Sequence, residues 1–261
     1  MSKMINMLIG ISLLLPIAVL AETPEEKGLA IAKEADRRDT GWGDQTANLK
    51  MVLRNRHGKE SLREIRTKTL EVDGDGDKAL SIFDNPRDVK GTAFLSFTHA
   101  LEPDEQWLYL PALKRVKRIS SSNKSGPFMG SEFSFEDLSS QEVEKYSYKF
   151  IRDENIEGRD TFVIERIPAY KHSGYTRMIT WLDKEMYQPL KIEFYDRKNK
   201  LLKTLTSSEH KQYEGKFWRP TRMHMINHQT KKSTELTWSN YQFKTGLKDS
   251  DFDRNSLKRA R

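Results

Sequence analysis

The chain has 261 residues, of which 45 are lysine or arginine and 38 are aspartate or glutamate, so its formal net charge is +7. It contains no cysteine, which excludes disulfides, thiolate metal sites, a cysteine nucleophile and lipid attachment through a cysteine. Charged residues make up 32 % of the chain and the two signs are interspersed, a pattern that does not by itself point to nucleic acid.

Residues 1–21 have the features of a secretory signal peptide. Lys3 supplies the positive start, an uncharged apolar stretch runs from Met4 to Leu20, and Val19-Leu20-Ala21 fits a cleavage site. The apolar stretch is short for a membrane span and Glu22 follows at once, so a retained anchor is the weaker interpretation. We therefore expect one mature domain, residues 22–261, that is exported, soluble and monomeric. Export argues against a nucleic-acid partner and favours transient contact with an anionic membrane surface.

A helix is predicted directly after the signal. Thr23 fits the N-cap, Pro24 the first helical position, and Glu26 completes a capping box. Apolar residues recur with a roughly helical period, and Gly41-Trp42-Gly43 ends the pattern. The apolar stripe consists of Leu29, Ile31, Ala32 and Ala35.

The remainder is predicted to be strands separated by short turns. Because the connections are too short for crossover helices, they favour an antiparallel sheet, a sandwich or a barrel. No linker rich in Pro or Ser divides the chain, which favours a single domain. The expected strands are 51–56, 62–72, 79–83, 92–97, 106–110, 114–118, 143–151, 161–167, 175–182, 190–195, 201–206, 219–226 and 234–243.

Residues 119–138 (ISSSNKSGPFMGSEFSFEDL) interrupt this pattern. Their Ser, Gly, Asn and Pro content predicts a loop, yet they include Phe128, Met129, Phe133 and Phe135. Soluble proteins rarely expose an apolar patch of that size, so these side chains must be buried. Two interpretations remain open: the loop caps the hydrophobic core, or it is a lid over a ligand cavity.

Motifs for chemistry are absent from the sequence. There is no G-x-S-x-G elbow and no glycine-rich phosphate loop, so we expect neither an enzyme nor a cofactor. His224 and His228 would lie too far apart on a strand to share a metal ion, and residues 73–77 (DGDGD) fit a tight turn better than a calcium loop. The basic strand 114–118 is either a solvated face or a contact for lipid phosphates or an acidic partner, and residues 257–261 are predicted to be a charged tail.

Three segments carry a resemblance to a known family: DNPRDVKGTAFL (84–95), QWLYLPALKRVKRI (106–119) and KSGPFMGSEFSFEDL (124–138). In combination they resemble the outer membrane lipoprotein-sorting protein family, a LolA-like group of bacterial periplasmic proteins. The resemblance runs along essentially the whole mature chain. None of the three segments is a catalytic signature.

The resemblance implies a mainly β fold, an incomplete, curved antiparallel β-barrel with a helix and loops covering its concave face. It implies that acyl chains of lipoproteins or other lipophilic cargo bind in an apolar groove there. It also implies work in the periplasm alongside an inner-membrane transporter of the resistance-nodulation-division type. Lacking cysteine, the chain resembles the soluble carrier rather than the lipid-anchored receptor.

The groove is expected to be lined by the central strands and the 119–138 loop. A one-residue error in a strand's register would move its side chains to the other face. A lipid- or envelope-polymer-modifying enzyme, an outer-membrane barrel and an accessory subunit with an ordinary filled core are the alternatives. The candidate lining residues are Phe94, Trp107, Tyr109, Phe128, Met129, Phe133 and Trp181.

Overall fold

The computed structural model describes residues 21–259. The predicted signal peptide therefore lies outside the described residues, apart from Ala21. Helix α1 (Pro24–Asp39) begins as predicted, because the Glu26 amide donates to Thr23 Oγ1 at 3.1 Å and the Thr23 amide donates to Glu26 Oε2 at 2.8 Å. Within the described residues, no helix combines the length and the hydropathy that crossing a membrane requires.

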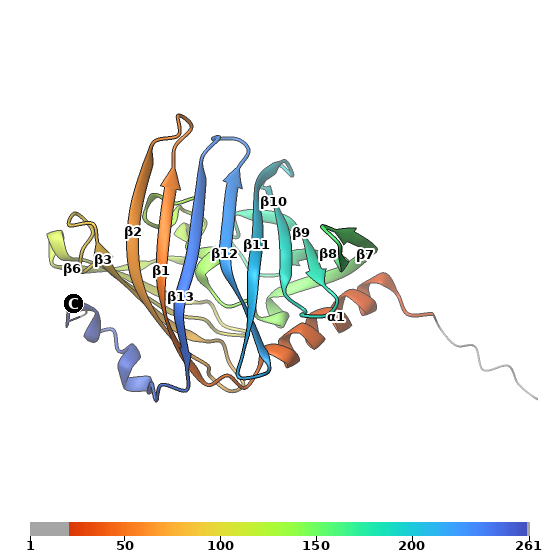
Figure 1. Ribbon diagram of the computed structural model, residues 1–261, viewed down its shortest axis with the longest axis horizontal. Helices are drawn as coiled ribbons and strands as arrows, with labels where there is room; N and C mark the ends of the chain where they lie inside the picture. The colour runs from red at the N-terminus through yellow and green to blue at the C-terminus, as the bar shows by residue number, and fades with distance from the viewer. Residues whose placement is uncertain (1–20, 260–261) are drawn as a thin grey trace, which may run out of the picture.

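Thirteen antiparallel strands form one sheet (Figure 1). Its order is β6-β5-β4-β3-β2-β1-β13-β12-β11-β10-β9-β8-β7, so β1 and β13 pair in the middle while β6 and β7 are the two edges. The strands are β1 (Asp44–Arg54), β2 (Glu60–Leu70), β3 (Lys78–Asn85), β4 (Ala93–Phe97), β5 (Glu105–Leu110), β6 (Arg115–Ile119), β7 (Tyr146–Ile156), β8 (Arg159–Pro168), β9 (Tyr175–Asp183), β10 (Pro189–Asp196), β11 (Leu201–Tyr213), β12 (Phe217–Asn227) and β13 (Ser233–Phe243).

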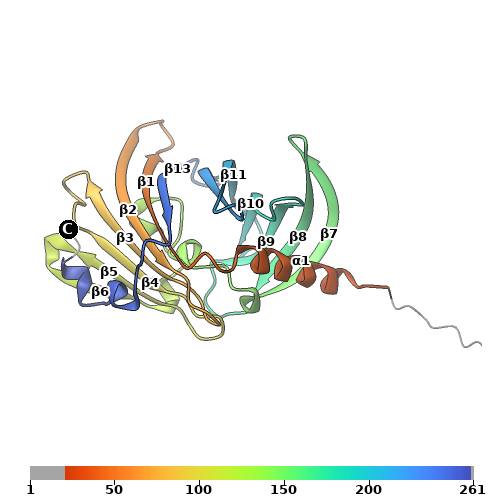
Figure 2. The ribbon, with the colours of Figure 1, turned by 60° about the horizontal axis from the view of Figure 1, so that its bottom comes forward.

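The sheet is strongly curved and does not close, which confirms the predicted incomplete barrel (Figure 2). Residues 120–145, which we call the crossing segment, connect edge strand β6 to edge strand β7. They lie within the hollow of the sheet as a series of turns and short 3-10 helices. The hollow is therefore occupied by the chain's own connection between its two edges.

Helix α1 packs against β7 at one end of the sheet. Gly28 allows the close approach, since a Cβ at this position would lie 2.7 Å from the Phe150 amide nitrogen. Ile31 and Ala32 of the helix then pack with Tyr148, Ile164 and Leu182 of strands β7, β8 and β9. Three residues of the predicted apolar stripe, Ile31, Ala32 and Ala35, therefore face the sheet, whereas Leu29 is exposed and does not belong to the buried face.

The C-terminal segment differs from the predicted charged tail. Short 3-10 helices η6 (Asp249–Phe252) and η7 (Ser256–Arg259) lie against strands β3 and β4, on the sheet face opposite the crossing segment. Phe252 and Leu257 are almost completely buried there. They pack with Leu80, Leu95 and Trp107, so the outer face of this half of the sheet is also apolar and covered.

Removing the Phe252 ring tests the contribution of this contact. Phe252→Ala is expected to lower the free energy of unfolding by about 3–5 kcal/mol, because a buried ring is replaced by a cavity. Urea denaturation measures it. The control is Leu101→Ala, whose side chain is 83 % exposed and should matter little. If Phe252→Ala lowered the free energy of unfolding as little as Leu101→Ala does, the C-terminal contact would not stabilise the fold.

Candidate functional site

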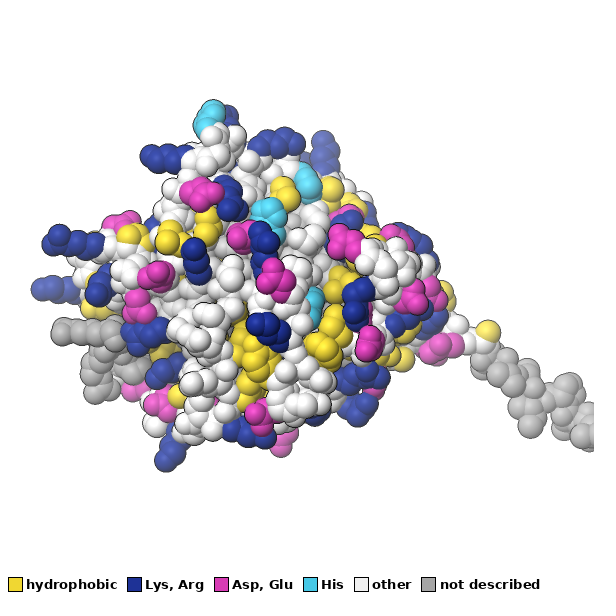
Figure 3. All heavy atoms as spheres, viewed as in Figure 1, with side chains coloured by type: hydrophobic (Ala, Val, Ile, Leu, Met, Phe, Trp, Pro, Cys, Tyr) yellow, Lys and Arg dark blue, Asp and Glu magenta, His cyan; other side chains and the backbone are white. Residues whose placement is uncertain are grey.

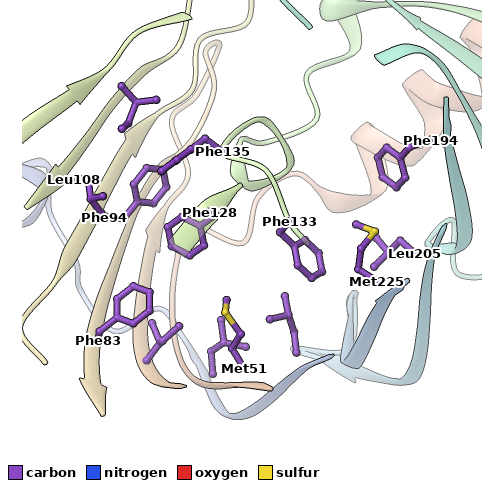
Figure 4. Packing of buried hydrophobic residues seen from close by; sticks show 14 of the residues in the cluster. Met51, Phe83, Phe94, Leu108, Phe128, Phe133, Phe135, Phe194, Leu205 and Met225 are labelled. Atoms are coloured by element: carbon purple, nitrogen blue, oxygen red, sulfur yellow. The ribbon is translucent and has the colours of Figure 1, made fainter. Parts of the chain in front are cut away.

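The concave face of the sheet holds a large apolar cluster that includes the crossing segment (Figure 4). Phe128, Phe133 and Phe135 from this segment lie among apolar side chains of strands from both halves of the sheet. The Phe128 ring centroid is 5.2 Å from that of Phe94 and 5.5 Å from that of Phe135. On the far side, the strands contribute flexible methionine and leucine side chains such as Met225 and Leu205.

Four of the seven predicted lining residues lie in this cluster. Phe94, Phe128 and Phe133 are buried members, and Met129 packs against them half-buried. The burial of the large apolar side chains of residues 119–138 is therefore observed, as expected for either interpretation of the loop.

The other three predicted residues lie on the opposite face, which corrects their assignment to the groove. Trp107 and Tyr109 belong to the cluster beneath the C-terminal segment. Trp181 packs with Val163 and Ile179 on the outer face of strands β8 and β9. The reason is register: side chains alternate along a strand, and both faces of this sheet are apolar in places.

The strand pairing shows which residues replace them. Phe94 is opposite Leu108, whereas Trp107 is opposite Leu95, so Leu108 faces the hollow and Trp107 faces outward. On β9 the inward side chain next to Trp181 is Thr180, which lines a cleft described below. The inward residues that sequence reasoning missed include Phe83, Leu108, Tyr175, Met178, Phe194, Leu205 and Met225.

Two carboxylates fasten the end of residues 119–138 to the β8–β9 connection and to strand β11. The Glu136 carboxylate accepts hydrogen bonds from the Tyr170 and Ser173 hydroxyls and, at 2.9 Å, from the Gly174 amide. The next carboxylate, Asp137, accepts from the Lys203 ammonium at 2.6 Å and from the Tyr175 hydroxyl at 2.7 Å. This segment is therefore held by charged hydrogen bonds as well as by apolar packing.

The Asp137–Lys203 pair is the most buried of these contacts. Its side chains are only 7 % and 4 % exposed, and Lys203 also donates to the Glu132 carbonyl at 2.9 Å. Burial, with the nearby Asp137 and Glu136 carboxylates, raises the pKa of Tyr175 well above its ordinary value, so its hydroxyl stays a donor. These contacts hold the end of the crossing segment against β9, β11 and the β8–β9 connection.

Removing the lysine tests the pair. Lys203→Met is expected to lower the free energy of unfolding by about 3–5 kcal/mol, because it leaves the Asp137 carboxylate buried without a counter-ion. The same change in the exposed Lys244–Glu214 pair, Lys244→Met, is the control and should cost less than about 1 kcal/mol. Equal urea midpoints for the two variants would contradict this account of the pair.

A cavity of about 410 Å³ lies on the β5–β6 side of the crossing segment. Leu108, Leu110, Ile119 and Phe135 give it apolar walls, and Lys117 lies at its edge. This cavity adjoins the apolar cluster, since Leu108, Ile119 and Phe135 belong to both. It provides open apolar space next to the buried phenylalanines.

A larger cleft of about 810 Å³ lies on the other side, between α1, the 71–77 turn and strands β8 and β9. We call it the acidic cleft, because eight carboxylates line it and Arg166 is the one Lys or Arg among its described lining residues. Its apolar walls include Ala32, Val143, Ile164, Leu182 and Ile192. The carboxylates are Asp36, Asp39, Glu71, Asp73, Asp75, Asp77, Glu142 and Glu144.

Crowding and burial perturb these carboxyl groups. Burial, with repulsion from Glu142, Glu71 and Asp39, raises the pKa of Asp77 to about 7. Burial is also the largest cause of the raised pKa of Asp36 and Glu142, with repulsion from neighbouring carboxylates adding to it. Negative charge in this cleft is therefore held at a free-energy cost to the folded protein.

The Asp77 shift predicts a pH dependence. An Asp in the unfolded chain has a pKa of about 4, so between about pH 4 and 7 the folded state keeps a proton that the unfolded state has lost. This contribution to stability is therefore present at low pH and is lost as pH rises toward 7. Asp77→Asn should flatten the loss of stability between about pH 4 and 7 in urea denaturation. The control, exposed Asp88→Asn, should keep the wild-type slope, and an unchanged slope in Asp77→Asn would contradict the assignment.

Comparisons with known proteins agree with this architecture. A family model described as an uncharacterized protein matches residues 75–259. A crystal structure from Vibrio parahaemolyticus, described as an outer membrane lipoprotein-sorting protein domain, is 60 % identical with a TM-score of 0.88, covering 90 % of this chain and 99 % of that chain. A DUF1329 family protein from Desulfovibrio piger is 33 % identical with a TM-score of 0.85, over the same shares of the two chains.

A LolA superfamily protein from Nitrosomonas europaea has the same fold. It is 20 % identical with a TM-score of 0.70, and the similarity covers 87 % of this chain and 98 % of that chain. No protein with a curated description matches the chain.

Proposed function

The chain belongs to the outer membrane lipoprotein-sorting protein family, whose fold is LolA-like, and from that premise we propose that it is a carrier of acylated cargo. The cargo is an acylated lipoprotein or another lipophilic molecule, and its acyl chains bind on the concave face of the sheet. Binding needs no catalytic group, because each buried methylene contributes ~0.8 kcal/mol through the hydrophobic effect alone.

The observation that carries the proposal is the nature of what fills the concave face. Phe128, Phe133 and Phe135 come from a connection between strands, and they insert into a surface built by both halves of the sheet. That surface is apolar and rich in adaptable side chains, including Met51, Met178 and Met225. An acyl chain that displaced the phenylalanines would find the same apolar environment.

The backbone of the crossing segment makes a tight turn at its apolar tip. Met129 has a φ of 48° and Gly130 a φ of 79°, so the tip turns through two consecutive left-handed residues. Glu132, shortly after this turn, is also held: its amide donates to Thr234 Oγ1 at 2.9 Å and its carboxylate accepts from the Asn227 side-chain amide at 2.7 Å. Movement of the tip has to break these hydrogen bonds and the one from Lys203 to the Glu132 carbonyl, whereas the contacts at Glu136 and Asp137 can stay in place as a pivot. We infer that residues 120–135 move to admit cargo while the contacts at 136–137 hold.

The proposed setting is the periplasm. The predicted signal peptide, residues 1–21, would direct export of a monomeric mature domain. This domain would move cargo between the inner and outer membranes and would touch each membrane transiently to load and release it. The basic edge strand β6, where Arg115, Lys117 and Arg118 are exposed, suits contact with anionic headgroups. An inner-membrane transporter of the resistance-nodulation-division type is the proposed partner, by family resemblance.

One observation favours a second candidate. The phenylalanines already fill the concave face, as they would in an accessory subunit of an envelope transport complex that binds no lipid. In that case the segment is a permanent part of the core. A measurement of lipid binding distinguishes the carrier from the accessory subunit.

The test uses a diazirine-labelled palmitic acid with the purified mature protein. We expect cross-links to map to residues 120–135 and to inward residues of β4, β5, β11 and β12. Phe133→Asp should weaken binding about tenfold, equivalent to ~1.4 kcal/mol. Leu113→Asp, which changes a side chain that is 65 % exposed and outside the cluster, is the matched control.

Two further measurements make the outcome decisive. Amide hydrogen exchange of residues 120–135 should increase when palmitate is added, and native mass spectrometry of protein from a periplasmic fraction should detect bound lipid. Absence of bound lipid together with unchanged exchange would favour the accessory subunit. Cross-links confined to the outer face, around Trp107 or Trp181, would reject the concave site.

A further inference from the structure

Two buried polar atoms in the acidic cleft, Thr180 Oγ1 and Arg166 Nε, lack hydrogen-bond partners among the described residues, although another nitrogen of Arg166, Nη1, donates to Gln141 Oε1 at 2.9 Å. Thr180 is 3 % exposed and its hydroxyl has no partner, and Arg166 is 9 % exposed with its Nε unpartnered. Both lie on the same face of neighbouring strands, since Thr180 is opposite Ile164 and Arg166 is opposite Met178. A buried polar group without a hydrogen-bond partner destabilises the fold, because it has lost its hydrogen bonds to water and gained none in the protein. A ligand oxygen placed between these two groups would offset that loss.

The rim of the cleft presents carboxylates that no cation neutralises. Asp36 and Glu144 form no ion pair within residues 21–259, and neither do Asp77 and Glu142. Other members are already occupied: Glu71 accepts from the Gly41 and Gly43 amides at 2.6 Å, and Asp39 pairs with Arg219. The carboxylates without an ion pair come from α1, the 71–77 turn and the crossing segment, so they converge from three elements. Of these, Glu142 accepts a hydrogen bond from the Ser140 hydroxyl at 2.7 Å.

This concentration of negative charge is local. The whole chain has a net charge of +7, and Lys and Arg side chains are spread among Asp and Glu over the face drawn in Figure 3. Long-range attraction therefore favours anions, whereas the cleft itself favours a cation. Selectivity for a cation must come from groups within a few ångströms of it, because salt screens exposed charges beyond about 8–10 Å.

The walls of the cleft are apolar between these two polar zones. Val143, Ile164 and Leu182 line it from the helix side, and Ile192 connects it to the apolar cluster of the concave face. A ligand that fits has three parts in order: an ammonium group at the rim, an acceptor oxygen at Thr180 and Arg166, and an apolar tail that leads toward the concave face.

We propose that the acidic cleft is a headgroup site that selects cargo carrying an ammonium group next to an ester or phosphate oxygen. This inference rests on the proposed function, because it names the polar end of the same cargo. An ethanolamine phospholipid has this arrangement, and so does an acylated peptide with a neighbouring amine. The cleft would discriminate against the equivalent lipid with a neutral or anionic headgroup.

The test compares two lipids with the same chain and phosphate. Palmitoyl lysophosphatidylethanolamine should bind about tenfold more tightly than palmitoyl lysophosphatidylglycerol, measured by calorimetry below the critical micelle concentration. The double variant Asp36→Asn/Glu142→Gln should abolish the preference, whereas the control Asp88→Asn, on an exposed residue elsewhere, should keep it. N-palmitoyl lysine carries the amine without a phosphate, so binding of this probe alone would indicate a peptide source.

Thr180→Val distinguishes a binding role from a structural one. Because the hydroxyl has no partner in the protein, its loss should leave stability unchanged or slightly higher. Affinity for lysophosphatidylethanolamine should nevertheless fall several-fold. Equal affinity for the ethanolamine and glycerol lipids, or a preference that survives Asp36→Asn/Glu142→Gln, would overturn the headgroup site and leave the carrier proposal intact. Failure of all three probes to bind would overturn both.

Discussion

The connection between the two edges of the sheet is the constraint on which the rest of the structure depends. Strands β6 and β7 are consecutive in the chain but lie at opposite edges of thirteen strands. At ~4.8 Å per strand, a flat sheet would separate these edges by roughly 58 Å. The crossing segment is folded into turns and 3-10 helices and so is far from extended. Curvature of the sheet brings its edges within reach, and the same curvature creates the hollow that the segment crosses.

The crossing segment consequently has two kinds of contact with different physical roles. Its phenylalanines are interchangeable with any apolar surface of similar shape, because dispersion and hydrophobic burial are not directional. Its carboxylates are not interchangeable, because Asp137 and Glu136 require donors at defined positions on β9, β11 and the β8–β9 connection. A buried ion pair adds little net stability over apolar packing. Its value here is positional: it determines where the segment sits against β9 and β11.

Local features were predictable from sequence, and features that depend on distant segments were not. The start of α1 was predictable because the capping residues Thr23 and Glu26 lie three positions apart. The antiparallel half-barrel followed from strand spacing and family resemblance. The prediction of which way a strand's side chains point was wrong at Trp107, because the C-terminal segment covers the outer face and both faces of the strand are apolar. No sequence motif predicted the acidic cleft, because its carboxylates come from residues 36–39, 71–77 and 142–144 and come together only when the chain folds.

The pairing of β1 with β13 has a consequence for how the sheet assembles. All other neighbouring strands are consecutive in the chain, so their hairpins can form from local contacts. The β1–β13 ladder instead joins residues as distant as Gln45 and Phe243. Closing so long a loop carries the largest entropy loss of any strand pairing in the sheet. Two meanders, β1 to β6 and β7 to β13, can therefore form separately. Their central seam then forms late, with exposed strand edges on both halves until it does.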